Sequence, residues 1–188
     1  MSGGPTPAAL LVIDMVNQLD FDKADRMAPG AVAAARRIGA LRQRFHERDW
    51  PVVFANDNFA QWRADFRELV AMTARTEGPP AEIMRELAPD ARDYFVLKPK
   101  HSAFLATPLA VLLAKLGVRR LLLTGMALES CVLATAADAN AREYEVAIVE
   151  DAVAGLPELR RPALRTLEES HTAQVLASRS ALAWAARA

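Results

Sequence analysis

Short apolar runs alternate with amphipathic stretches along this 188-residue chain, and this alternation constrains the fold more than any other feature. It is typical of an α/β domain in which helices cover both faces of a parallel sheet. We expect strands at residues 8–13, 52–55, 94–97, 120–124, 146–149 and 173–177. We expect helices at residues 30–48, 60–73, 107–116, 130–141, 157–169 and 179–187. The pattern therefore predicts a three-layer α/β/α, Rossmann-like fold with a six-stranded parallel sheet.

Several of the expected helix ends carry chemical markers. Thr107 followed by Pro108 supplies an N-cap and a proline at the first helical position, and Leu156 followed by Pro157 offers the same proline position. Gly117 is suited to the position just after a helix C-terminus.

The length of the chain fits a single domain. We expect a loose tail at residues 1–7 and one domain over residues 8–188. The longest irregular stretch, residues 76–80, reads Thr-Glu-Gly-Pro-Pro and is too short to divide domains. It is predicted to be a loop between short helices.

Charge and cysteine content limit the possible partners and locations. Lys plus Arg and Asp plus Glu number 23 each, so no overall charge favours nucleic acid or an anionic membrane. The apolar runs are far shorter than a membrane span, and the N-terminus lacks a basic segment followed by an apolar one. A single cysteine excludes an intramolecular disulfide framework. We expect a cytoplasmic protein that binds neither nucleic acid nor membrane.

Three residues with acid, base or nucleophilic chemistry follow predicted strands. Asp14 comes directly after the first strand, Lys98 ends the third, and Cys131 follows the fourth at the start of a helix. The carboxyl ends of parallel strands meet at one edge of a sheet, where ligands bind. Their convergence predicts a site at that edge. The helix N-terminus is expected to lower the pKa of the Cys131 thiol toward neutrality.

Each of these residues also has a simpler explanation. An aspartate after a strand is often only a turn former, most strand-end lysines are solvated, and a lone cysteine is commonly a small buried hydrophobe. Lys100, two residues after Lys98, is the rival candidate for the functional lysine.

Three sequence blocks resemble the signature of the isochorismatase-like cysteine hydrolases, in the isochorismatase and nicotinamidase superfamily. They are Leu-Leu-Val-Ile-Asp14-Met-Val-Asn, Lys98-Pro-Lys-His-Ser-Ala-Phe, and Leu-Thr-Gly-Met-Ala-Leu-Glu-Ser-Cys131-Val. The resemblance covers about residues 8–155. It implies the strand order 3-2-1-4-5-6.

The resemblance also implies a catalytic triad that hydrolyses a C–N bond through a thioester. Cys131 would be the nucleophile, Asp14 the base and Lys98 the cation that orients both. The family has a cis peptide before the cysteine, which here would join Met126 to Ala127. The backbone N–H groups of Ala127 and Cys131 would form the oxyanion hole.

The chain departs from the family pattern at positions that concern the substrate and a metal. Val16 stands where many members have glutamine. Nicotinamidases bind a metal through histidines after the second strand, whereas residues 56–62 here read Asn-Asp-Asn-Phe-Ala-Gln-Trp. His46, His101 and His171 lack metal-ligand spacing, and His46 and His171 are expected at a surface or an interface. We therefore expect no metal and no cofactor, with Asn56 and Asp57 as loop groups near the pocket.

A small, flat substrate needs apolar walls with few polar groups. Phe59, Trp62, His101 and Phe104 are the candidate pocket residues, with core packing as the alternative for Phe104 and helix packing for Trp62. The shape of the pocket is expected to depend on loops at residues 15–30 and 56–106.

The leading hypothesis is a metal-independent hydrolase of a small-molecule amide, ureide or carbamate. The alternatives are a vinyl-ether hydrolase of the isochorismatase type and a catalytically silent binding or assembly domain. We also expect a homo-oligomer, a dimer or higher, because the last helix carries Leu182, Trp184 and many alanines and has little polar surface. The alternative is that this helix packs on the sheet of its own chain.

Overall fold

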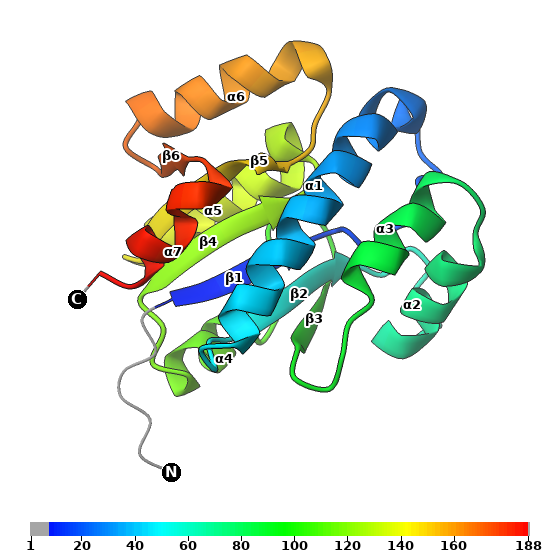
Figure 1. Ribbon diagram of the computed structural model, residues 1–188, viewed down its shortest axis with the longest axis horizontal. Coiled ribbons are helices and arrows are strands. Elements are labelled where there is room, and N and C mark those ends of the chain that lie inside the picture. The colour runs from blue at the N-terminus through cyan, green and yellow to red at the C-terminus, as the bar shows by residue number, and fades with distance from the viewer. Residues whose placement is uncertain (1–7, 188) are drawn as a thin grey trace.

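A single six-stranded parallel sheet forms the centre of the molecule, in the order β3-β2-β1-β4-β5-β6 (Figure 1). The structure is a computed structural model and describes residues 8–187. The strands are β1 (Ala8–Ile13), β2 (Val52–Asp57), β3 (Tyr94–Lys98), β4 (Arg120–Gly125), β5 (Glu145–Val153) and β6 (Gln174–Leu176). The predicted six strands, their parallel direction and their order are confirmed. The tail expected at residues 1–7 lies outside the described residues.

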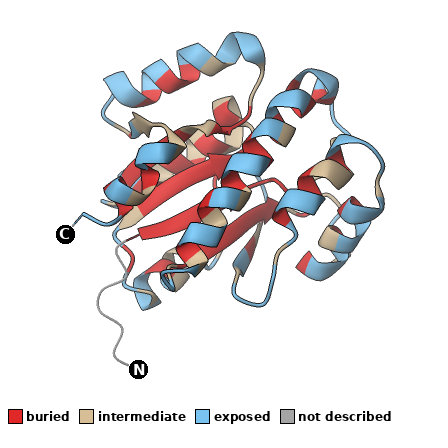
Figure 2. Cartoon of the chain, viewed as in Figure 1, coloured by how far each residue is buried: buried red, intermediate tan, exposed pale blue. Residues whose placement is uncertain are grey.

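Within residues 8–187, seven α-helices cover the two faces of the sheet. They are α1 (Ala24–His46), α2 (Phe66–Arg75), α3 (Pro79–Leu87), α4 (Leu109–Lys115), α5 (Leu133–Asn140), α6 (Pro157–Glu169) and α7 (Ser178–Ala185), and a π-helical turn, η1 (Leu128–Val132), runs into α5. Helices α1, α2, α3 and α7 pack in one apolar cluster, and α4, α5 and α6 in the other. Figure 2 shows buried strands between helices whose outer sides are exposed.

Strand β1 shows why the continuous apolar runs form the centre of the sheet. Its six residues are fully buried. Leu10 and Val12 belong to the cluster on one face, whereas Leu11 and Ile13 belong to the cluster on the other. Alternate residues of a strand point to opposite faces, so a strand covered on both sides must be apolar throughout. Each such side chain contributes about 1.5–3 kcal/mol by its burial.

Helix α3 matches none of the helix ranges expected from the sequence, although residues 76–80 were expected to form a loop between short helices. Part of it was assigned to the loop at residues 76–80, but Pro79 and Pro80 occupy the first helical positions, where their missing N–H groups cost nothing. The helix packs closely on α1, because a Cβ added at Gly39 would lie 3.0 Å from the carbonyl oxygen of Glu86. Packing against α1 thus stabilises a helix that begins at the Pro-Pro pair, where the sequence alone predicts a loop.

Other element ends agree with the sequence in part. Leu156 is the N-cap before Pro157, and Gly117 follows α4 with φ of 67°, both as predicted. Pro108 is itself the N-cap of α4, although the Thr107 hydroxyl still accepts a hydrogen bond from the Leu109 N–H at 3.2 Å. Helix α1 begins six residues earlier than expected and contains Pro29.

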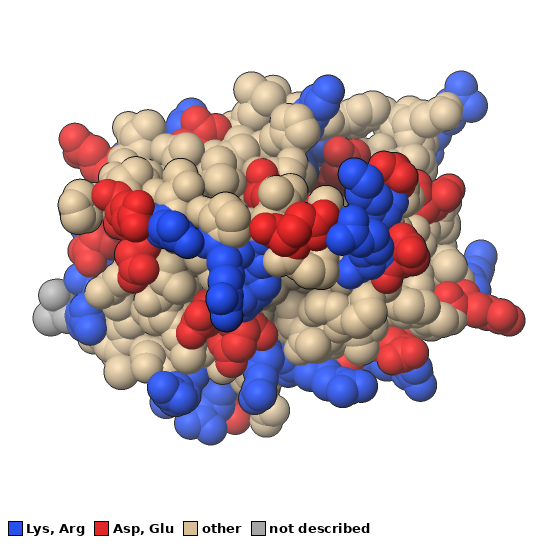
Figure 3. All heavy atoms as spheres, turned by 90° about the horizontal axis from the view of Figure 1, so that it is seen from above, with Lys and Arg blue, Asp and Glu red and all other residues tan. Residues whose placement is uncertain are grey.

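The surface carries both signs of charge, and Figure 3 shows acidic and basic side chains interspersed on one face. Among residues 8–187, no helix is both long and apolar enough to cross a bilayer.

Helix α7 uses its apolar side within the chain's own core. Trp184 is only 4% exposed, and Ala181 and Ala185 are fully buried in the apolar cluster that contains helix α1. The apolar surface that motivated the predicted homo-oligomer is therefore already covered. The homo-oligomer stays a prediction, but this helix no longer supports it.

Replacing Trp184 with alanine is expected to lower the free energy of unfolding by about 3–5 kcal/mol, because it leaves a large cavity in the core. Chemical denaturation followed by circular dichroism measures the loss. Trp62→Ala is the matched control, since Trp62 is 59% exposed, and should change stability by less than about 0.5 kcal/mol. A loss for Trp184→Ala that depends on protein concentration would instead place this side chain between two copies.

Candidate active site

The structure brings Asp14, Lys98 and Cys131 into direct contact at the carboxyl edge of the sheet. The Lys98 Nζ lies 2.8 Å from Asp14 Oδ2 and 3.5 Å from Cys131 Sγ. The negative charge of Asp14 also acts on the thiol and raises its pKa. The carboxylate and the thiol thus contact the same ammonium group, which places them near enough for a proton to pass between them directly or through one water.

Asp14 is held in place by its backbone and its side chain. Its N–H donates to the Ala55 carbonyl at 3.0 Å, and its Oδ1 accepts a hydrogen bond from the Asp57 N–H at 2.8 Å. Its φ of 52° lies in the left-handed region, which a non-glycine residue adopts at some energetic cost. Gly125, at the end of β4, allows the end of β1 to lie close beside it, because a Cβ there would clash with the Ile13 carbonyl oxygen.

Lys98 is fully buried behind the site and remains charged. Burial acts to lower the pKa of Lys98, but the negative charges of Asp14 and of an ionised Cys131 outweigh burial and raise it above the ordinary lysine value. A buried ammonium group is stable only with such partners. Lys98 can therefore supply a fixed positive charge between the carboxylate and the sulfur.

The thiol differs from the sequence-based expectation. Burial, and then the negative charge of Asp14, raise the pKa of Cys131 to about 11, although Lys98 acts in the opposite direction. These two effects outweigh the helix N-terminus, on which the expectation of a near-neutral pKa rested. In the unliganded protein near pH 7 the sulfur keeps its proton, and Asp14 is the adjacent group that can accept it.

The segment that carries Cys131 is tied to its surroundings on both sides. The peptide bond between Met126 and Ala127 is cis, as the family resemblance implied. The Ala127 carbonyl accepts from the N–H groups of Ser130 and Val132, which flank Cys131 in the chain.

Thr135 connects the cysteine segment to the loop after β3. Its hydroxyl donates to the Cys131 carbonyl at 2.7 Å and accepts from the Ala103 N–H at 3.0 Å. The turn bearing the thiol is thus joined to the chain that continues from Lys98.

A cavity of about 470 Å³ opens above the thiol. Its walls come from the β1–α1 loop with the start of α1, the end of β2, the loop after β3, and the segment containing Met126 and Cys131. Phe59 and His101, two of the predicted pocket residues, are in the lining, as is Lys100.

Trp62 and Phe104 lie elsewhere, in contrast to the sequence-based expectation. The Trp62 side chain is largely exposed and is not part of the lining. Phe104 is 5% exposed and packs against the Tyr144 ring, with the Arg142 guanidinium 5.0 Å from its ring centre. Its core-packing alternative is therefore the one that the structure supports.

Sequence reasoning did not single out Asn17, Gln18, Asp20 and Phe21, which line the cavity from the β1–α1 loop. The loop itself was expected to shape the pocket, and its polar residues, which begin at Asn17, were the available signal.

Asn56 in β2 and Asn58 just after it have structural roles. The Asn56 side chain accepts from the Val16 N–H at 3.0 Å and donates to the Val16 carbonyl at 2.8 Å. Asn58 donates to the Ala64 carbonyl and accepts from the Ala60 N–H. Both carboxamides are thus committed to backbone groups, whereas Asp57, the last residue of β2, lines the cavity with a carboxylate that has no hydrogen-bond partner among the described residues.

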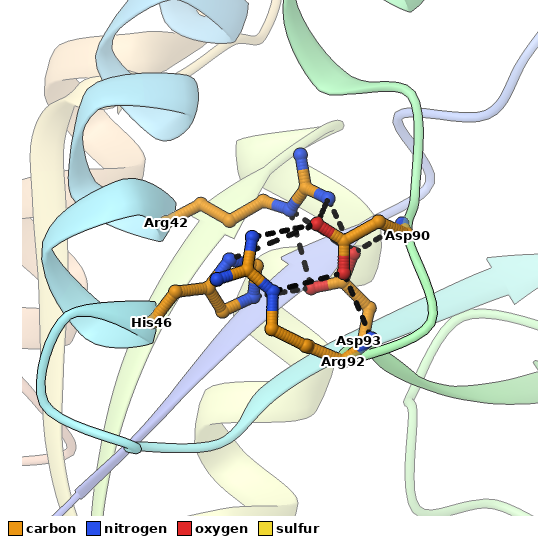
Figure 4. Close-up of polar contacts among 5 residues, drawn as sticks. All are labelled: Arg42, His46, Asp90, Arg92 and Asp93. Carbon is orange, nitrogen blue, oxygen red and sulfur yellow. Dashed lines mark hydrogen bonds and ion pairs between the residues drawn. The ribbon is translucent and has the colours of Figure 1, made fainter.

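A second polar cluster lies at the opposite, amino end of the sheet (Figure 4). His46 was expected at a surface or an interface, but its side chain is 6% exposed and its Nε2 lies 2.8 Å from Asp93 Oδ1. Arg42 binds the Asp93 carboxylate through two nitrogens, and a hydrogen bond from Arg92 lowers the pKa of Asp90 to about 2. His46, Asp90 and Asp93 could offer three metal-ligand atoms. The two arginines already neutralise these carboxylates.

His171 is exposed, as predicted.

Comparisons with known proteins agree on one family. The model of the isochorismatase domain matches residues 8–180. An uncharacterized isochorismatase family protein of Bacillus subtilis, YaaI, is 38% identical over 146 residues, which cover 78% of this chain and 80% of the relative. A ureidoacrylate amidohydrolase, RutB of Methylorubrum extorquens, is 40% identical and covers 85% of this chain and 75% of the relative.

Two further relatives have named activities. The maleamate amidohydrolase of Pseudomonas putida is 32% identical over 77% of this chain and 71% of its own length. The crystal structure of N-carbamoylsarcosine amidase from Thermoplasma acidophilum is 27% identical, with a TM-score of 0.69 over 91% of this chain and 96% of that one.

Asp14→Asn is expected to lower the pKa of the Cys131 thiol. The variant removes a negative charge that opposes ionisation and retains the positive charge of Lys98. The midpoint of the pH profile for iodoacetamide alkylation should therefore move to lower pH.

Lys98→Met is the matched control for this experiment, because it removes the charge of opposite sign. Its alkylation profile should move to higher pH, or the thiol should react more slowly throughout. Profiles that move in the same direction for both variants would contradict this electrostatic account of the thiol.

Proposed function

The chain belongs to the isochorismatase family, and we propose that it is a cysteine hydrolase that cleaves a C–N bond of a small amide, ureide or carbamate through a thioester. The observation that carries the proposal is the contact of Lys98 with both Asp14 and Cys131 beneath an open cavity. Cys131 is the nucleophile, Asp14 the proton carrier and Lys98 the positioning cation.

Acylation begins with a neutral thiol. As the Cys131 sulfur attacks the carbonyl carbon, its proton passes to Asp14 and the carbonyl electron pair moves to oxygen. The C–N bond then breaks, and Asp14 returns the proton to the departing nitrogen, which leaves as an amine or as ammonia. The acyl group remains on sulfur, and Asp14 is again a carboxylate.

Deacylation uses the same carrier in the same order. Water attacks the thioester carbon while Asp14 accepts one of its protons. The C–S bond then breaks, and the proton passes to Cys131, which restores the thiol. The sum is amide plus water giving acid plus amine, and Lys98 keeps its charge throughout. A raised thiol pKa suits this cycle, because the sulfur takes its proton back at the end.

The oxyanion hole consists of the backbone N–H groups of Ala127 and Cys131 in this proposal. Met126, Ala127 and Cys131 all line the cavity, so a carbonyl oxygen bound above the sulfur can reach this segment. Donors fixed by the backbone stabilise the developing charge without reorganisation, and each is worth about 3–4 kcal/mol of the barrier.

The substrate class follows from the relatives and the rim of the cavity. Three relatives are named for maleamate, ureidoacrylate and N-carbamoylsarcosine, each of which carries a carboxylate beside its C–N bond. Lys100 and His101 stand exposed at the cavity, where they can pair with such an anionic group.

We place the enzyme in the cytoplasm, where a reducing environment preserves a free catalytic thiol.

Ammonia release from a panel of maleamate, 3-ureidoacrylate, N-carbamoylsarcosine and simple primary amides tests the activity. Cys131→Ala and Asp14→Asn should abolish release, and Lys98→Met should reduce it at least about 100-fold, because each removes a group required for the transfer of charge or protons. Their melting temperatures establish that the fold persists.

Lys100→Ala is the matched lysine control and should keep catalysis on a neutral amide within about threefold. An essential Lys100 would mean that the functional lysine is assigned wrongly. A vinyl-ether hydrolase would release no ammonia and would retain activity in Cys131→Ala, and a silent binding domain would show no turnover of any panel member.

Exhaustive chelation is expected to leave activity unchanged. The proposal needs no metal, since Asp14 and Lys98 supply the charges and the asparagines near the end of β2 are committed to loop hydrogen bonds. Activity is compared before and after dialysis against a chelator, with metal content measured in parallel. Recovery of a lost activity by stoichiometric zinc would overturn metal independence.

A further inference from the structure

One carboxylate in the wall of the cavity has no part in the mechanism above. Asp57, the last residue of β2, lines the cavity and is half-buried. Within residues 8–187, its two side-chain oxygens make no hydrogen bond or ion pair, in contrast to Asp14. A carboxylate that is partly removed from water and left without a partner is costly unless a ligand supplies one.

The position of Asp57 relative to the reacting groups is fixed. Its own N–H holds Asp14 Oδ1 at 2.8 Å, and it is the registered neighbour of Lys98 across the β2–β3 pair. Asn56, one residue earlier, anchors the strand end to Val16 through two hydrogen bonds. The free carboxylate therefore stands beside the group that delivers the proton to the departing nitrogen.

We infer that Asp57 is a further catalytic residue, which accepts a hydrogen bond from the N–H of the departing nitrogen. The inference rests on the proposed function. When Asp14 protonates the nitrogen, positive charge develops there before the C–N bond breaks. A carboxylate that faces this charge binds the transition state more strongly than the neutral amide, so it accelerates the chemical step.

The electrostatics of Asp57 agree with this role. Burial raises the pKa of Asp57, Lys98 opposes that rise, and Asp14 adds to it. A protonated nitrogen in the cavity would stabilise the ionised carboxylate and oppose the rise in the pKa of Asp57. A metal is a poorer match for the same group, because Asn58 is committed to its loop and Phe59 offers no ligand atom.

The test compares two substrates that share one acyl group. The first is whichever panel amide, maleamate or 3-ureidoacrylate, releases ammonia, and the second is its counterpart with OCH₃ in place of the scissile NH₂. Asp57→Asn keeps the side-chain shape and the N–H that holds Asp14, but removes the charge. It should lower kcat for the amide about 10- to 100-fold, and kcat for the methyl ester less than about threefold, because the ester oxygen carries no N–H.

Asp20→Asn is the matched control, since Asp20 is a second carboxylate of the lining, exposed at the rim. It should leave the amide-to-ester ratio unchanged. Asp57→Ser should give the same altered ratio as Asp57→Asn, which separates lost charge from altered packing, and ester turnover reports that each variant is folded. Equal losses on both substrates, or no loss on either, would overturn the role of Asp57. If the wild-type protein cleaves neither amide, the proposed function fails and this inference fails with it.

Discussion

The buried ion pair between Asp14 and Lys98 is the constraint on which the rest of the site depends. Removing two charges from water costs several kcal/mol for each ion, so the pair persists only where its geometry is good and its remaining polar atoms are satisfied. The strand order meets this condition. Lys98 belongs to β3, which β2 separates from β1, so its long side chain crosses the end of β2 to reach Asp14. The Asp57 N–H at that strand end satisfies the other carboxylate oxygen.

The same ion pair determines the state of the sulfur. Asp14 and burial favour the protonated thiol, while Lys98 favours the thiolate. A helix N-terminus alone would have produced a reactive thiolate that is open to oxidation. Placing a carboxylate next to the thiol instead keeps the sulfur protonated until a substrate carbonyl is present. Reactivity then depends on proton transfer within the site rather than on the pH of the solvent.

Local sequence patterns were sufficient to predict the six-stranded sheet and the convergence of Asp14, Lys98 and Cys131 at one edge of it. Apolar runs such as residues 8–13 can only be satisfied between two helical layers, and the carboxyl ends of parallel strands necessarily meet. Signals that depend on distant packing were misread. The Pro79-Pro80 pair predicts a loop, but it begins α3, which packs on α1. Phe104 was predicted to line the pocket, but it packs against Tyr144 and Arg142 instead. The thiol pKa followed burial, which the sequence does not record.

The two ends of the sheet distribute their polar groups differently. At the amino end, the Asp93 carboxylate is saturated by Arg42 and His46, an arrangement that only stabilises. At the carboxyl end, the Glu129 Oε2 is buried without a partner among the described residues, and the Asp57 carboxylate is free as well. An unpaired buried acceptor such as Glu129 Oε2 costs about 1–3 kcal/mol, whereas the Asp57 carboxylate is only half-buried. Of these two residues, Asp57 lines the cavity and Glu129 does not, so the Asp57 carboxylate is the one that a substrate can bind, as expected for a site in which stability is given up for catalysis.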